Sequence, residues 1–198
     1  GSSISRHPPI GWEDMPTVND EIQACKDRLA EVIEAAPNAK RYWTLGNHDA
    51  RFETKLASEV PAYGKINGMH LKDHFPEWLN CWSLWINDDV VIKHRWKGGV
   101  HATHNNAKDS GKTFINGHLH SLKVTPVTDY NGTRWGVDTG TLAPTFGPQF
   151  NDYCEDNPRN WREGFAVLTF VDGQLQWPEV VYVIENGKVG FRGRVWDV

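Results

Sequence analysis

The sequence predicts an α/β fold, and three observations support this class. An amphipathic segment near the start has apolar residues at helical spacing, and a short apolar strand follows it. Several later strands are joined by Asn-Gly or Asp-Gly turns, which are typical of β-hairpins. Two short motifs that contain histidine come directly after expected strands, where α/β sheets present ligands and catalytic groups.

The clearest element is a helix over residues 18–36. Its apolar side chains recur three or four residues apart and therefore share one face: Ile22, Cys25, Leu29, Val32, Ile33 and Ala36. Thr17 or Asn19 can cap the first turn, and Pro37 follows the end. Residues 41–45 then form a short buried strand, so the two elements make half of an α/β unit.

The rest of the chain alternates between strands and loops, with one further clear helix. That helix is expected over residues 101–109 and is ended by Gly111. Two hairpins are expected, each across a turn rich in Asn, Asp or Gly: 84–86 with 90–92, and 122–128 with 133–137. The other expected strands are 112–116, 165–171, 180–184 and 189–195. Irregular segments are expected at 1–16 (an extended entry loop), 51–75 (with short helices) and 143–160.

Composition describes an ordinary globular chain. The 198 residues are enough for one domain with its own core, and we expect a single domain over residues 1–198. The formal net charge of -4 gives no broad basic surface for nucleic acid, although a nucleic-acid substrate held at a local site stays open. The three cysteines are far apart, which favours a reducing, cytoplasmic location. No apolar run approaches the ~20 residues of a membrane span, so no membrane contact is expected.

Imidazole and amide groups lie at the ends of three expected strands. The sequence Gly-Asn-His-Asp occupies residues 46–49, and Gly-His-Leu-His occupies residues 117–120. Between them in the sequence, His94 follows the strand 90–92 almost directly. Nitrogen and oxygen ligands from several strand ends suit first-row divalent metals. Each motif by itself is also compatible with an ordinary turn, and only the two motifs together with His94 indicate a metal site.

Together the two motifs resemble the GNH[DE] and GHxH signatures of the calcineurin-like metallophosphoesterases. The resemblance covers residues 42–142 and is strongest for small bacteriophage-type phosphoesterases, at the stretches 93–99, 117–123 and 135–141. It implies a four-layer α/β/β/α sandwich and a two-metal site that hydrolyses phosphomonoesters or phosphodiesters. The expected function is thus a metal-dependent phosphoesterase. The alternative is a non-catalytic protein of the same fold that binds a metal or a phosphorylated partner.

The resemblance also implies four metal ligands: Asn47, His94, His118 and His120. The first three would bind one metal, and the fourth would bind the other. His101 and His104 are alternatives to His94, which we prefer because it ends a strand directly. The expected metal of the complete family site is Mn²⁺, with Zn²⁺, Ni²⁺ or Fe as further candidates.

Two more residues receive roles near the reacting phosphate. His48 is not a ligand in the resembling family. We expect it to act as the general acid or to steer the leaving group, and an imidazole suits this role because its usual pKa is near neutral pH. Arg51 is expected to contact the substrate phosphate. The substrate would be a phosphate ester, with nucleotides and nucleic acids among the candidates.

The sequence departs from the family at its start, because neither the DxH nor the GDxxD motif occurs. The helix 18–36 is the one that should follow GDxxD, so we interpret the chain as an N-terminally shortened domain that lacks its first two strands. Without the carboxylates of those motifs, the remaining ligands favour Zn²⁺ or Ni²⁺ over Mn²⁺. The missing strands would leave an open sheet edge on the N-terminal side, and we expect self-association there.

Overall fold

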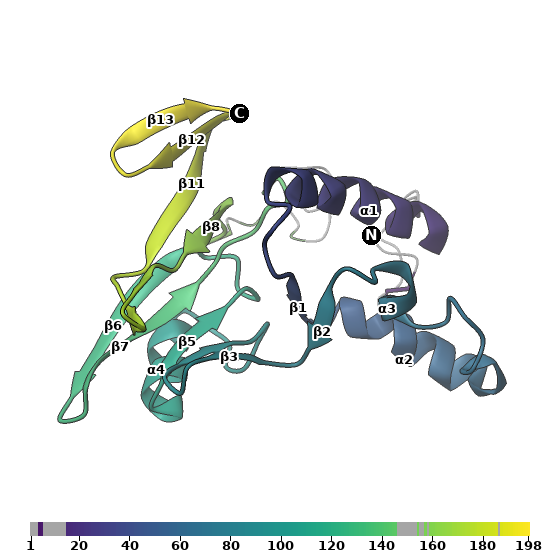
Figure 1. The fold of residues 1–198 in the computed structure, drawn as a ribbon, viewed down its shortest axis with the longest axis horizontal. Coiled ribbons are helices and arrows are strands. Elements are labelled where there is room, and N and C mark those ends of the chain that lie inside the picture. Colours follow the sequence, from purple (N-terminus) through teal and green to yellow (C-terminus); the bar gives the residue numbers. More distant parts are fainter. Residues whose placement is uncertain (1–3, 6–14, 146–153, 155–156, 158, 186) are drawn as a thin grey trace. The chain divides into compact units, whose positions relative to one another are not determined.

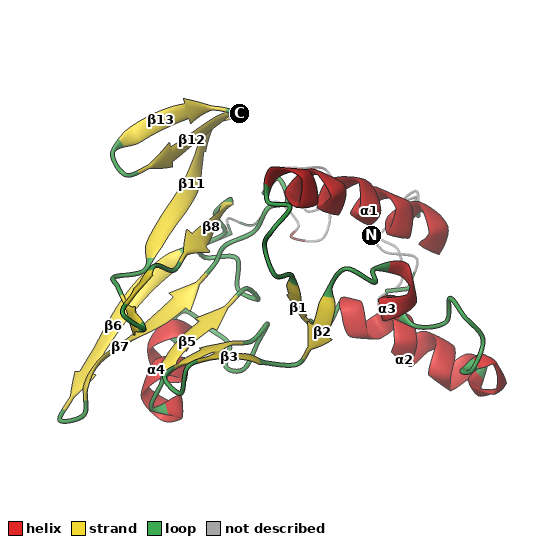
Figure 2. Cartoon of the chain, in the orientation of Figure 1, coloured by secondary structure: helices red, strands yellow, loops and turns green. Residues whose placement is uncertain are grey.

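The chain forms a mixed α/β protein with α-helices and several β-sheets, which confirms the predicted class (Figures 1 and 2). Its residues group into two compact units, Gly1–Cys81 and Trp82–Val198, and the prediction of a single domain stays a prediction. No helix in the described part is both long and apolar enough to cross a membrane. The computed structural model describes residues 4–5, 15–145, 154, 157, 159–185 and 187–198.

The first unit begins with the predicted helix, α1 (Val18–Ala35). Its first turn is closed by a capping box, in which Thr17 Oγ1 accepts from Asp20 N at 3.2 Å and Asp20 Oδ2 accepts from Thr17 N at 3.0 Å. The predicted apolar face packs at Ile22, Cys25 and Leu29 on a core of three buried residues: Phe52, Leu71 and Phe75. The helical period in the sequence therefore identified the buried side of this helix.

The remaining elements of the first unit are short: β1 (Tyr42–Thr44), α2 (Asp49–Glu59), the 3₁₀ turn η1 (Pro61–Tyr63), α3 (Leu71–His74) and β2 (Leu79–Cys81). Strands β1 and β2 pair in parallel, with Trp43 opposite Asn80. The sequence analysis did not predict β2, because its residues Leu79-Asn80-Cys81 do not form an apolar run like that of β1. Among the described strands β1 pairs with β2 alone, and the expected self-association at an open edge stays a prediction.

The loop between η1 and α3 is held by hydrogen bonds. His70 Nε2 lies 2.8 Å from Gly64 O, and His70 Nδ1 lies 3.3 Å from Glu53 Oε2. Asp73 Oδ2 accepts a hydrogen bond from Gly68 N at 2.9 Å. An acceptor at each ring nitrogen favours the doubly protonated imidazole. The contact with Gly64 O, followed by that with the Glu53 carboxylate, therefore raises the pKa of His70 above 6.5.

We expect the stability of the first unit to fall as the pH rises through the folded-state pKa of His70. Because this pKa lies above 6.5, the stabilisation is complete below the unfolded value and is lost as the pH passes the folded value. His70→Ala should remove this part of the pH dependence, whereas the exposed His104 of the second unit can be replaced by Ala without removing it. Urea unfolding on both sides of pH 6.5, with an NMR titration of His70, makes the measurement. A His70 pKa at or below that of a free histidine would contradict the expectation.

The second unit is built on a five-stranded sheet of order β3-β4-β5-β7-β6. Its strands are β3 (Leu84–Ile86), β4 (Val90–Ile92), β5 (Thr113–Asn116), β6 (Lys123–Asp129) and β7 (Gly132–Asp138). Both predicted hairpins of this sheet, β3 with β4 and β6 with β7, are confirmed. The three central strands β4, β5 and β7 run parallel, so their C-terminal ends lie at one edge of the sheet.

One face of the sheet is covered by α4 (Ala102–Ser110), in the place predicted for a helix. The helix ends at Gly111, whose left-handed φ of 66° is the conformation that glycine adopts without strain. It lies directly on β7 at Gly136, where an added Cβ would come within 1.9 Å of Thr103 O. The close approach of helix and strand therefore requires glycine at this position.

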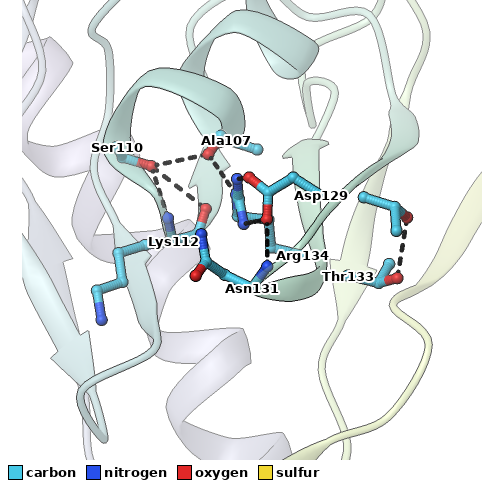
Figure 3. A network of polar contacts seen from close by, with 8 residues as sticks. Ala107, Ser110, Lys112, Asp129, Asn131, Thr133 and Arg134 are labelled. Carbon is cyan, nitrogen blue, oxygen red and sulfur yellow. Dashed lines mark hydrogen bonds and ion pairs between the residues drawn. The ribbon is translucent and has the colours of Figure 1, made fainter.

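Arg134 joins the end of α4 to the hairpin of β6 and β7 (Figure 3). Its Nε donates to Ala107 O at 3.1 Å, and its Nη2 forms an ion pair with Asp129. Asp129 Oδ1 also accepts from Asn131 N at 2.8 Å, which shapes the turn between the two strands. The bond from Arg134 satisfies one of the carbonyl groups that the last turn of a helix leaves without an intrahelical partner.

The opposite face of the sheet carries the buried residues Val90, Ile115 and Val137. Leu168, Phe170 and Leu175, from the segment after the sheet, pack against them. This late region consists of β8 (Gly164–Val167), β9 (Phe170–Val171), β10 (Gln174–Leu175), β11 (Glu179–Glu185), β12 (Lys188–Phe191) and β13 (Arg194–Asp197). Four of these strands form a second sheet of order β13-β12-β11-β8.

Two strand predictions in the late region are corrected. The expected strand 165–171 is divided into β8 and β9. The expected strand 189–195 is wrong, because β12 and β13 form an antiparallel hairpin around Arg192 and Gly193. Both turn residues have left-handed φ values, 49° and 71°. Much of the expected loops 1–16 and 143–160 lies outside the described residues.

Candidate functional site

His94 and His118 are brought together by the parallel pairing of β4 and β5. The hydrogen-bond ladder continues past the ends of both strands, with Lys93 N donating to Ile115 O at 3.0 Å and Gly117 N donating to His94 O at 3.2 Å. Each histidine follows its strand by two residues. The register sets His94 level with Gly117, so the two histidines lie one residue out of register at the same edge of the sheet. Residues far apart in the sequence thus become neighbours at a strand-end position.

The two imidazoles are in direct contact and half-buried. His118 Nδ1 lies 3.2 Å from His94 Nε2, and the ring centroids are 5.1 Å apart at an interplanar angle of 64°. Two nitrogens that bind one tetrahedral metal at ~2.0–2.1 Å stand roughly 3.3 Å apart. The separation of these nitrogens therefore fits two ligands of one metal, and it equally fits a hydrogen bond between a donor and an acceptor imidazole.

Asp138, at the end of β7, organises the turn that carries His118 and His120. Its side chain is fully buried, with 0% exposure. Its two oxygens accept from four backbone N–H groups: Leu119 at 3.2 Å, Ser121 at 2.8 Å, Leu122 at 3.3 Å and Gly140 at 3.1 Å. His120 and Leu122 have left-handed φ values of 59° and 42°, which are costly for residues other than glycine. The bonds to Asp138 hold the turn in this conformation.

A chain of buried amides extends this network to the segment that carries His94. Asn116 Nδ2 donates to Asp138 Oδ2 at 2.7 Å, and Asn106 Nδ2 donates to Asn116 Oδ1 at 3.3 Å. Asn106 Oδ1 then accepts from Lys97 N at 3.1 Å, three residues after His94. One buried polar chain therefore supports both histidine-bearing segments.

The sequence analysis missed this network. It singled out no residue of the chain Asp138, Asn116 and Asn106 as functional. The one local signal was that Asp138 ends an expected strand and precedes Thr139-Gly140, where a carboxylate often accepts a nearby N–H bond, as it does here from Gly140.

His120 packs against Trp161 rather than against the other two histidines. The ring centroids of His120 and Trp161 are 4.9 Å apart at an interplanar angle of 73°. Burial lowers the pKa of His120 below its usual 6.5, and the nearby Asp138 carboxylate opposes this shift only in part. The imidazole is therefore neutral near neutral pH, as a metal ligand must be.

The other predicted site residues belong to the first unit. Asn47 is half-buried, and the exposed His48 occupies the N-cap position of α2. Asp49 Oδ2 accepts from Gly46 N at 2.6 Å, which closes the turn of the motif, and Arg51 lies in the first turn of α2. Within the described ranges no three His, Cys, Asp or Glu side chains gather closely enough to hold a metal ion. The convergence of all four predicted ligands stays a prediction.

Comparison with known proteins adds no assignment to this site. No protein-family model, no curated protein and no solved structure matches the chain. The case for a function therefore depends on the motifs in the sequence and on the geometry around the paired histidines.

Proposed function

We propose that this chain is a metal-dependent phosphoesterase of the calcineurin-like type, with that family's four-layer sandwich and with a two-metal site to which its sequence contributes neither the DxH nor the GDxxD ligands. It would hydrolyse phosphomonoesters or phosphodiesters. The observation that carries the proposal is the 3.2 Å contact between His94 Nε2 and His118 Nδ1 at the strand ends. The family resemblance independently implies that these two histidines bind the same metal.

In this proposal the residues have separate roles in metal binding, proton transfer and phosphate binding. His94 and His118, with the amide oxygen of Asn47, would hold one divalent ion, and His120 would contribute to a second. Such ions, when bound, lower the pKa of a water and neutralise phosphoryl oxygens. His48 gives a proton to the leaving oxygen, and Arg51 orients the phosphate through its guanidinium. Neutral imidazole ligands favour Zn²⁺ at the first position.

A second function, the binding of a phosphorylated molecule without hydrolysis, is favoured by a separate observation. The carboxylate beside the histidine turn, Asp138, is committed to backbone N–H groups. The groups left around the turn are imidazoles and the exposed guanidinium of Arg162. The guanidinium can bind phosphate oxygens even when no metal is bound.

The first test of the proposed function is metal binding. We expect Zn²⁺ to bind the 198-residue chain, and His94→Ala and His118→Ala each to weaken this binding by at least about tenfold, since each removes a direct ligand. His104→Ala is the matched control, because His104 is an exposed histidine of the same unit, and it should leave the affinity unchanged. Calorimetric titration measures all four proteins. Equal Zn²⁺ affinity in the His94 and His118 variants would contradict the proposal.

Turnover then separates the two functions. With Mn²⁺ or Zn²⁺ added, hydrolysis of bis-p-nitrophenyl phosphate should rise only slightly above background, because the sequence lacks the carboxylates that offset repulsion between two close dications. This slight activity should disappear in His118→Ala and persist in His104→Ala. Metal binding without any turnover that depends on His118 would favour the binding function. Robust turnover with Mn²⁺ would contradict the view that the absent motifs carry essential ligands.

A further inference from the structure

We propose that the segment 159–162 forms the substrate-recognition side of the histidine site. In this proposal Arg162 binds a phosphate oxygen and Trp161 packs against a planar group of the ester. The substrate class is then a phosphate ester of a nucleoside or of another planar aromatic alcohol. This inference deepens the proposed function and rests on it for the location of the reacting phosphate.

The segment is fixed to the site by its main chain. Arg162 N donates to His120 O at 2.7 Å, and Thr141 N donates to Arg162 O at 3.1 Å. The first bond joins the segment to the histidine turn, and the second joins it to the residues that follow β7. His120 lies between two residues whose N–H groups bond to Asp138, and Thr141 follows a third, Gly140, so the segment is attached to the turn that Asp138 organises.

Arg162 presents a positive charge beside the turn. Its Nη1 donates to Ser121 O at 3.2 Å and to Asn160 Oδ1 at 2.7 Å, and both acceptors are neutral. The side chain is exposed, and no carboxylate of the described residues pairs with it. One edge of the guanidinium is thus anchored, while Nε and Nη2 can bind two oxygens of a phosphate.

Trp161 provides an aromatic surface next to His120. The ring lies edge-on to the imidazole at 73° and is half-buried, so part of it is accessible to a ligand. The guanidinium carbon of Arg159 lies 5.1 Å from the centre of the Trp161 ring system and adds a second positive charge. An aromatic ring beside arginine is a common arrangement for stacking a base while holding its phosphate.

The neighbouring carboxylate is hydrogen-bonded to another segment. Glu163 Oε1 accepts from Thr145 N at 2.6 Å and from Thr145 Oγ1 at 2.9 Å, and among the described residues no ion pair joins Glu163 to Arg162. The segment therefore offers cationic and aromatic groups to the site together. Neither group alone would select a planar phosphate ester, because arginine binds any phosphate and tryptophan stacks on any planar ring.

Binding without metal tests the inference on the whole chain. In the presence of EDTA, NMR titrations compare adenosine 5′-monophosphate, 4-nitrophenyl phosphate, ribose 5-phosphate, inorganic phosphate and adenosine. We expect at least one of the two aromatic esters to bind about tenfold more tightly than ribose 5-phosphate, the effect of one stacking contact. Preference for the nucleotide alone identifies a nucleoside, and equal binding of both esters identifies any planar alcohol; either result supports the inference. Ribose 5-phosphate that binds as well as both aromatic esters would overturn it.

Variants assign the effect to the two residues. Trp161→Leu should remove the advantage of the aromatic esters, and Trp161→Phe should keep most of it, which excludes a general loss of structure. Arg162→Gln should weaken every phosphate ligand about tenfold and leave adenosine unchanged. Arg194→Gln and Trp196→Leu, exposed residues of β13, are matched controls and should change nothing. If the segment variants behave like these controls, the inference is wrong.

The outcome of this experiment can be distinguished from the outcome of the test of the proposed function. The titrations contain no metal, whereas the proposed function is tested by Zn²⁺ binding at His94 and His118. If His94→Ala and His118→Ala leave Zn²⁺ binding unchanged while the chain still prefers aromatic esters, the phosphoesterase is refuted and a site for aromatic phosphate esters remains. If both variants weaken Zn²⁺ binding but the chain shows no preference for aromatic esters, only the role of Trp161 and Arg162 is refuted.

Discussion

Gly136→Ala is expected to destabilise the second unit by about 3 kcal/mol, the upper part of the range for overpacking. The added methyl group would lie 1.9 Å from Thr103 O and 2.4 Å from Thr103 C, which are backbone atoms of α4. A flexible side chain could rotate away, but the helix backbone can only move as a whole. We therefore expect α4 to be displaced from β7 and the packing beneath it to be lost. Urea unfolding monitored by circular dichroism gives the change in free energy.

Gly98→Ala is the matched control for this prediction. Gly98 lies in an exposed loop of the same unit, and nothing stands within 4 Å of the position of its added Cβ. Its replacement should change the free energy of unfolding by less than about 0.5 kcal/mol. If the two alanine variants were equally stable, the close contact between α4 and β7 would be wrong.

Asp138→Ala is expected to cost on the order of 4 kcal/mol and to abolish metal binding at His94 and His118. The carboxylate accepts from four backbone N–H groups and from Asn116 Nδ2 in a fully buried position. Each buried donor left without an acceptor costs ~1–3 kcal/mol, and partial repacking recovers some of the total. The left-handed backbone at His120 would lose the bonds that maintain it. Urea unfolding and Zn²⁺ titration measure the two effects.

Asp138→Asn distinguishes the effect of the Asp138 side chain's size and hydrogen bonds from the effect of its negative charge. It keeps the size of the side chain but replaces one accepting oxygen with an NH₂ group, so we expect a smaller loss of stability than with alanine. Loss of the negative charge should lower the pKa of His120 further, because Asp138 raises it in the native protein. NMR titration of His120 measures this shift. Asp197→Ala, at an exposed site in β13, is the control, and an Asp138→Ala variant as stable as this control would refute the network.

Local signals in the sequence predicted most of the secondary structure. The helix α1 was found because its apolar period and its cap at Thr17 both lie within one segment. The hairpin of β6 and β7 was found because Asn131-Gly132 favours a tight turn between two alternating strands. Hairpins of this kind need no information from distant residues, which is why a single sequence is sufficient for them.

The strand predictions failed where the local sequence signal was weak or where apolar residues favoured a strand across a turn. Strand β2 has a polar residue at its centre, Asn80, and is defined by its pairing with β1, a partner distant in sequence. The strand predicted over 189–195 was wrong because its apolar residues concealed the turn at Arg192 and Gly193, which only the pairing of β12 with β13 makes evident. Strand propensity depends strongly on such context.

The sequence by itself determined the chemical groups of the candidate site and the strand ends at which they stand. His94 and the motif at 117–120 were identified from residue type and spacing alone. Only the tertiary structure decided that His94 contacts His118, that Asp138 supports the turn, and that Trp161 packs on His120. The physical reason is that strand order and side-chain packing join residues distant in sequence, and no local pattern encodes which strand will lie beside which.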